Sequence, residues 1–70
     1  MDSVHRFARN LRKHRESAGL SQERLAFKCR LHRTEISLLE RGVREPRLST
    51  IIRLSRGLGI PAAELLNGVR

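Results

Sequence analysis

Apolar residues recur at intervals of three and four along almost the whole chain, and no stretch alternates apolar with polar residues long enough to predict a strand. Ser21 and Ser49 each precede such a stretch, and their hydroxyls are expected to cap the helices that follow. The pattern predicts an all-α fold, a compact bundle of five short helices joined by tight turns. The expected helices cover roughly residues 3–18, 22–29, 33–41 and 50–58, and a fifth begins at Pro61 and ends near Gly68.

The chain is long enough for one small hydrophobic core. A compact domain of about this size buries only about 60% of the surface that its unfolded chain exposes, so we expect a single domain of marginal stability spanning residues 1–70. Gly57 is expected to weaken the fourth helix by roughly 1 kcal/mol relative to alanine. The apolar residues expected to face the core are Val4, Phe7, Ala8, Leu11, Ala18, Leu25, Ala26, Cys29, Ile36, Leu39, Ile51, Leu54 and Leu58.

Positive charge is the strongest compositional signal. Fifteen Lys and Arg residues against seven Asp and Glu give a formal net charge of +8. This excess favours a polyanionic partner such as nucleic acid; the alternative is a soluble surface whose arginines reflect genomic base composition. The only aromatic residues, Phe7 and Phe27, offer almost no platform for stacking single-stranded bases, so double-stranded DNA is favoured.

The sequence favours neither a membrane protein nor an enzyme. No apolar run reaches the roughly 18 residues of a spanning helix, and no secretory signal is visible, so we expect a cytoplasmic protein. Cys29 is interpreted as a small buried hydrophobe, because a metal site built from Cys29 and His32 with His5 or His14 lacks the second ligand pair of structural zinc. The only aspartate, Asp2, lies at the terminus, which leaves a Ser-His-Asp triad without a third member. We therefore expect no catalytic site, metal or cofactor.

Residues 21–42, with the sequence SQERLAFKCRLHRTEISLLERG, carry the motif that indicates function. Two short helices joined by a three-residue turn describe the DNA-binding helix-turn-helix. Such a motif needs a small residue where the helices cross, an apolar residue in the turn and an apolar anchor on the second helix. Ala26, Leu31 and Ile36 supply these at compatible spacing.

With the Leu58-Gly59-Ile60 and Glu64-Leu65-Leu66 segments that follow it, this stretch resembles the phage-repressor and Cro-like helix-turn-helix family. The run HRTEIS followed by ERG is most similar to small stand-alone regulators such as the controller proteins of restriction–modification systems. The resemblance covers about residues 6–68. It implies a lambda-repressor-like domain of five helices that binds inverted DNA repeats as a homodimer.

The helix over residues 33–41 is then the recognition helix, which enters the major groove with its N-terminal residues leading. Arg33 is the best candidate for reading bases, because arginine can bind guanine O6 and N7 bidentately. Thr34 and Ser37 lie on the same accessible face. His32 is expected either to contact DNA or to cap its helix, and Leu38 either to add apolar contact with bases or to lie at the edge of the core.

Other polar residues are expected to contact the DNA backbone. Gln22 stands at the first turn of its helix, where free amides favour a phosphate, and the matching residue of the family contacts the backbone. The resemblance implies further backbone contacts from Arg44 and Arg47, with solvated loop charges as the alternative. Glu35 is expected to cap its own helix, with acceptance of a hydrogen bond from a cytosine amine as the alternative.

The resemblance also implies structural roles. Arg15 and Glu40 match positions that form an ion pair in the family, and we expect this pair to orient the recognition helix. Arg30 stands where the family usually has glycine, so a left-handed conformation there would be strained. Phe27 is expected to be partly exposed, either towards a partner or across neighbouring Arg and Lys side chains. The expected dimer interface consists of Ile60, Pro61, Ala62, Leu65 and Leu66.

Together these features predict a homodimeric, sequence-specific transcription regulator that binds double-stranded DNA. An alternative from another class is an interaction module of the antitoxin type, which holds a protein partner and binds DNA secondarily. A basic domain that coats DNA without sequence preference is a further alternative.

Overall fold

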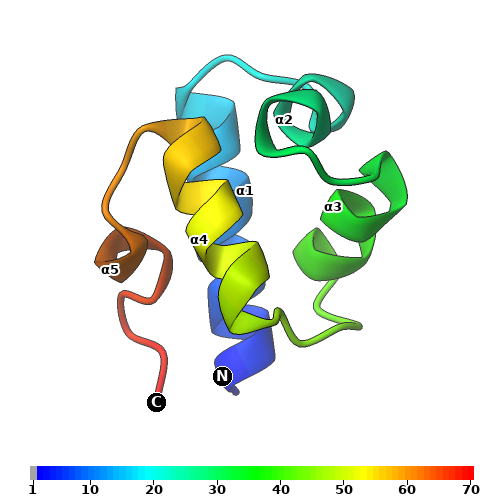
Figure 1. Cartoon of the computed structure of the whole chain (residues 1–70). Helices are drawn as coiled ribbons and strands as arrows, with labels where there is room; N and C mark the ends of the chain where they lie inside the picture. Colours follow the sequence, from blue (N-terminus) through cyan, green and yellow to red (C-terminus); the bar gives the residue numbers. More distant parts are fainter. Residues whose placement is uncertain (1) are drawn as a thin grey trace.

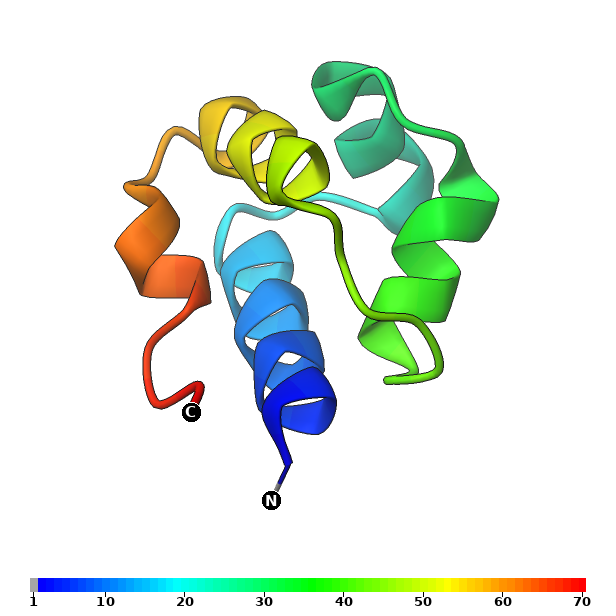
Figure 2. The same cartoon turned by 60° about the horizontal axis from the view of Figure 1, so that its bottom comes forward.

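The computed structural model describes residues 2–70, and within this range the chain forms five helices and no strand. Helices α1 and α4 lie between the α2–α3 pair on one side and α5 on the other (Figures 1 and 2). Contacts join α1 to α3 and α5, α2 to α3 and α4, and α4 to α5. The predicted all-α bundle is confirmed. The helices are α1 (Ser3–Ser17), α2 (Gln22–Cys29), α3 (Arg33–Glu40), α4 (Leu48–Leu58) and α5 (Ala62–Leu65).

The core lies where these helices meet. Cys29 is buried beside the fully buried residues, and burial raises the pKa of its thiol, as expected for a small apolar side chain rather than a reactive one. Ala18, which the periodicity assigned to the core, is exposed because Gly19 turns the chain with φ 71° immediately after α1. Leu20 packs against the core instead. The largest fully buried side chains are Phe7, Leu11, Leu25, Ile36, Leu39, Leu54 and Leu65.

The first three helices begin with side-chain caps. The Asp2 carboxylate accepts a hydrogen bond from the His5 amide at 2.9 Å, and the Ser21 hydroxyl accepts one from the Arg24 amide at 3.1 Å. At α3 the Nδ1 atom of His32 accepts a hydrogen bond from the Thr34 amide at 3.1 Å. Each cap satisfies one of the free amides that every helix leaves at its N-terminus.

The start of α4 differs from the prediction. The helix begins at Leu48 with Arg47 in the N-cap position, and no side chain caps it. Ser49 lies inside the first turn, so the prediction that it caps this helix is wrong. The earlier start places Thr50 and Ile51 on the buried face of the first turns. The helix therefore begins at a position where no capping side chain is available.

Gly57 has a packing role that helix propensity alone does not reveal. A Cβ atom built on Gly57 would lie 2.3 Å from the Sγ atom of Cys29, so α2 and α4 approach each other through the space that glycine leaves. The glycine therefore permits close packing of these helices as well as weakening α4.

We expect Gly57→Ala to lower the free energy of unfolding by about 1–2 kcal/mol, because overpacking in a core outweighs the gain in helix propensity. Chemical denaturation monitored by circular dichroism measures the change. The double variant Gly57→Ala, Cys29→Ala removes the clashing sulfur and should recover most of the loss. A Gly57→Ala protein more stable than wild type would contradict the packing argument.

Candidate nucleic-acid interface

The turn between α2 and α3 depends on a left-handed residue. Arg30 has φ 57° and ψ 40° and is the only non-glycine residue with positive φ within residues 2–70. The amide of the next residue, Leu31, donates a hydrogen bond to the Ala26 carbonyl at 2.9 Å, and the Leu31 side chain packs against the core. Arg30 thus adopts the left-handed conformation that the glycine usual in the family would adopt without strain. It ends α2 and directs the chain into α3 within three residues.

A buried ion pair holds α3 against α1. Arg15 Nε donates to Glu40 Oε2 at 2.6 Å and Arg15 Nη2 donates to Glu40 Oε1 at 3.0 Å. The side chains are only 12% and 3% exposed. Hydrogen bonding to Glu40 raises the pKa of Arg15 by more than burial lowers it. The pair implied by the resemblance is thus formed, and it fixes α3 relative to α1.

Gln22 extends this network to α2. Its Nε2 atom donates to Glu40 Oε1 at 3.1 Å, an interaction that the sequence did not predict. The bond uses one of the two amide hydrogens, and Gln22 still lines an open hollow together with Arg33. The structure therefore brings a residue expected at the DNA backbone beside a residue expected to read bases.

The outer face of α3 presents three of the predicted base-reading residues. Arg33 and Thr34 are exposed, Ser37 is partly exposed, and all three line one shallow hollow. Leu38 is half-buried, and His32 is exposed while its Nδ1 atom caps the helix. The structure shows the capping role of His32, and its ring stands beside the recognition face.

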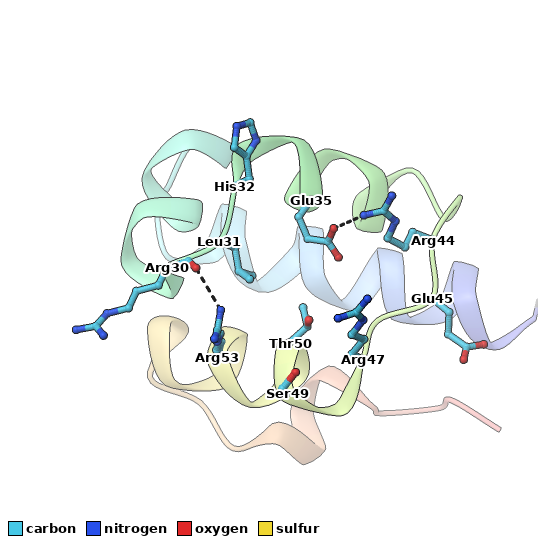
Figure 3. A pocket seen from close by; sticks show the side chains of 10 residues that line it. All are labelled: Arg30, Leu31, His32, Glu35, Arg44, Glu45, Arg47, Ser49, Thr50 and Arg53. Atoms are coloured by element: carbon cyan, nitrogen blue, oxygen red, sulfur yellow. Dashed lines mark hydrogen bonds and ion pairs between the residues drawn. The ribbon is translucent and has the colours of Figure 1, made fainter.

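A cleft of about 800 Å³ opens between the start of α3, the loop after it and the first turns of α4 (Figure 3). Within it Arg44 Nη1 donates to Glu35 Oε1 at 2.5 Å. Glu35 therefore does not cap its own helix, because His32 forms the cap and the carboxylate bonds to the loop. The sequence carried no signal for this pair. Arg47 lines the same cleft, and no ion pair of the described residues includes it.

The positions of the apolar surface residues modify the expected dimer interface. Leu65 is 0% exposed and belongs to the core of the protomer, so it has no surface to offer to a partner. Pro61 and Leu66 are exposed, whereas Ile60 and Ala62 are partly buried against the core. Three other exposed apolar residues lie outside the interface predicted from the sequence: Leu48 and Ile52 on α4 and Phe27 on α2.

Phe27 is 83% exposed, more than the partial exposure predicted for it. The side chains of the neighbouring Arg and Lys residues therefore do not cover its ring.

No group of three His, Cys, Asp or Glu residues within residues 2–70 is arranged to hold a metal ion. In the same range no helix combines the length and the apolarity needed to cross a bilayer.

Comparison with known proteins agrees with this geometry. Residues 11–65 match the model of a helix-turn-helix family. The chain is 48% identical over 50 residues to control protein C.BamHI of Bacillus amyloliquefaciens, covering 71% of this chain and 62% of that protein. It is 42% identical over 66 residues to control protein C.SmaI of Serratia marcescens, covering 94% and 79% respectively. The chain thus spans about three fifths of the length of C.BamHI.

A solved structure shows the same fold. The restriction–modification controller protein C.AhdI from Aeromonas hydrophila superimposes with a TM-score of 0.86 and 40% sequence identity, covering 89% of this chain and 94% of the other. The chain therefore belongs to the helix-turn-helix family. Within that family it is homologous to restriction–modification control proteins, which confirms the resemblance seen in the sequence.

Proposed function

We propose that the protein is a non-enzymatic transcription regulator that binds an inverted-repeat operator in double-stranded DNA as a homodimer. Its similarity to control proteins extends the proposal to regulation of a restriction–modification system. The observation that carries the proposal is the exposed N-terminal face of α3 with Arg33, Thr34 and Ser37, which the buried pair behind it holds in place. A rigid helix with such a face fits the major groove.

In this proposal the interface divides into two sets of contacts. Arg33 binds a guanine edge, while Thr34, Ser37, Leu38 and His32 contact neighbouring base edges or the thymine methyl group. A second set of residues, Gln22, Arg44 and Arg47, binds phosphates and positions α3 in the groove. The guanidinium of Arg44 is partly neutralised by Glu35. Arg47 is exposed and forms no ion pair within residues 2–70. It therefore contributes more to the binding of phosphates than Arg44 does.

The proposed homodimer places two copies of α3 in successive major grooves. Pro61 and Leu66 supply exposed apolar area at the C-terminal end, with Ile60 and Ala62 partly accessible beside them. A two-fold dimer reads two half-sites about one helical turn apart, which is why an inverted repeat is the expected operator.

Selection of bound sites from a random double-stranded library by the purified protein tests the proposal at near-physiological salt. We expect enrichment of an inverted repeat whose half-sites lie about one helical turn apart. Salt-sensitive binding without enrichment would show that the protein binds only DNA phosphates. That result would overturn the claim that it recognises a base sequence.

We expect Arg33→Ala to weaken binding to the selected site by about 1–3 kcal/mol and to relax preference at one base pair. Arg47→Ala should weaken binding to selected and scrambled duplexes alike and lower the salt slope by about 1. Fluorescence anisotropy with both duplexes measures these effects. Arg9→Ala, which removes an exposed charge from α1, is the matched control. Loss of affinity without altered preference in both Arg33→Ala and Arg47→Ala would refute this division of roles.

A further inference from the structure

One ion pair joins two segments that both carry predicted DNA contacts. The Glu35 carboxylate, on the first turn of α3, accepts a hydrogen bond from Arg44 Nη1 in the loop that follows α3 (Figure 3). Of the other ion pairs within residues 2–70, two join close neighbours at or along α1, and the third is the buried pair of Arg15 and Glu40. The pair of Glu35 and Arg44 therefore places a negative charge directly at the predicted interface.

The protein holds the two partners of this pair to different degrees. The side chain of Glu35 is 21% exposed, whereas that of Arg44 is 51% exposed. The carboxylate is also favoured by its place in the first turn of α3, at the positive end of the helix dipole. Within residues 2–70 the guanidinium makes one hydrogen bond, through Nη1, and its Nε and Nη2 atoms are left for another acceptor. An anion that approaches from solvent therefore meets an arginine whose charge Glu35 partly neutralises.

The remaining charges of the cleft make Glu35 stand out. Glu45 also borders the cleft, but it points away from Arg47 in Figure 3 and takes part in no ion pair within residues 2–70. A polyanion in the cleft must either displace the Glu35 carboxylate from Arg44 or bind Arg44 with that carboxylate close by, and both weaken the attraction. The arginines that line the cleft are Arg30, Arg44, Arg47 and Arg53.

We propose that Glu35 competes with DNA phosphates for Arg44 and thereby limits the affinity of the protein for DNA of any sequence. That the competing anion is DNA rests on the proposed function. A chain with a net charge of +8 attracts every duplex through counterion release. A carboxylate that masks one arginine lowers this attraction and leaves the exposed face of α3 unchanged. Glu35 therefore acts on sequence-independent affinity, which every non-operator site in the cell shares.

Removing the charge of Glu35 tests the proposal. Glu35→Gln keeps the size of the side chain and an oxygen that can accept a hydrogen bond from Arg44. We expect it to tighten binding about fivefold on selected and scrambled duplexes alike and to raise the salt slope by about 1, because one more arginine then neutralises a phosphate. Glu16→Gln breaks an exposed ion pair on α1 outside the cleft and is the charge-matched control. It should change affinity by less than about twofold. Fluorescence anisotropy measures the affinities, and circular dichroism checks that each variant is folded.

A double-mutant cycle with Arg44→Ala separates competition for Arg44 from general repulsion of DNA. Arg44→Ala should weaken binding about twofold in wild type but about tenfold in the Glu35→Gln protein, where the arginine is no longer masked. An equal gain from Glu35→Gln with and without Arg44 would overturn the proposal. Weaker binding of the selected duplex by Glu35→Gln would also overturn it, since that result is expected if the carboxylate accepts a hydrogen bond from a cytosine amine.

The scrambled duplex keeps this test separate from that of the proposed function. A protein that selects no DNA sequence but shows the coupling of Glu35 and Arg44 on scrambled DNA would refute the proposed regulator and support the role of Glu35. A protein that selects an inverted repeat, but whose affinity for both duplexes is the same in wild type and Glu35→Gln, would refute the role of Glu35 alone.

Discussion

Replacing Arg15 by alanine is expected to lower the free energy of unfolding by about 3–5 kcal/mol, because the change leaves a buried carboxylate without its charged partner. Glu40 is only 3% exposed on its side chain and would retain a single side-chain donor, Gln22. That loss is a large fraction of the stability available to a chain this small. Chemical denaturation at neutral pH measures it.

Arg12→Ala is the matched control on the same helix. It removes an ion pair with Glu16 whose side chains are 65% and 56% exposed, and such surface pairs contribute about 0–1 kcal/mol. Equal, small effects of Arg15→Ala and Arg12→Ala would show that the pair between α1 and α3 does not stabilise the fold.

The pair is expected to contribute throughout the range of pH in which the protein would work. The pKa of Arg15 is raised in the folded protein, chiefly by its hydrogen bonds to Glu40. A cation with a raised folded pKa stabilises the fold fully below its unfolded pKa and loses that contribution only as pH rises through the folded value. For an arginine that window is strongly alkaline. Titration of Arg15 should therefore not change the effect of Arg15→Ala between mildly acidic and mildly alkaline buffers.

Local signals in the sequence were sufficient for most of the fold. Helical periodicity depends on neighbours three and four residues apart, so the five helices and the burial of Leu25, Ile36 and Leu54 follow from short stretches of sequence. The left-handed conformation at Arg30 was implied only by the resemblance, because the family usually has glycine at this position. The spacing of the motif placed Arg33 on the exposed face of α3.

What the sequence could not reveal depends on contacts between distant segments. Gly57 appears as a defect in a helix until Cys29, on another helix, is seen in the space beside it. Glu35 and Arg44 are nine residues apart across a loop, and no periodicity relates them. Ser49 is a better capping residue than Arg47, yet the helix begins two residues earlier than local preference predicts, with Thr50 and Ile51 buried in its first turns.

Leu65 and Leu66 are adjacent apolar residues that the sequence alone assigns to the same interface, but the structure separates them. The Leu65 side chain is fully buried, and the Leu65 carbonyl accepts a hydrogen bond from Asn10 Nδ2 at 2.9 Å, which ties α5 to α1. Leu66 remains 39% exposed. The two residues should therefore respond differently when the stability of the protomer and the association of protomers are measured separately.

We expect Leu65→Ala to lower the free energy of unfolding by about 2–5 kcal/mol at every protein concentration, because it opens a cavity in the protomer. Leu66→Ala should affect the protomer much less but weaken association, and so flatten the rise of the unfolding midpoint with concentration that a dimer shows. Denaturation at several concentrations and analytical ultracentrifugation separate the two effects. If Leu65→Ala instead weakened association and left the dilute protomer as stable as wild type, Leu65 would belong to the dimer interface, and the packing of α5 described above would be wrong.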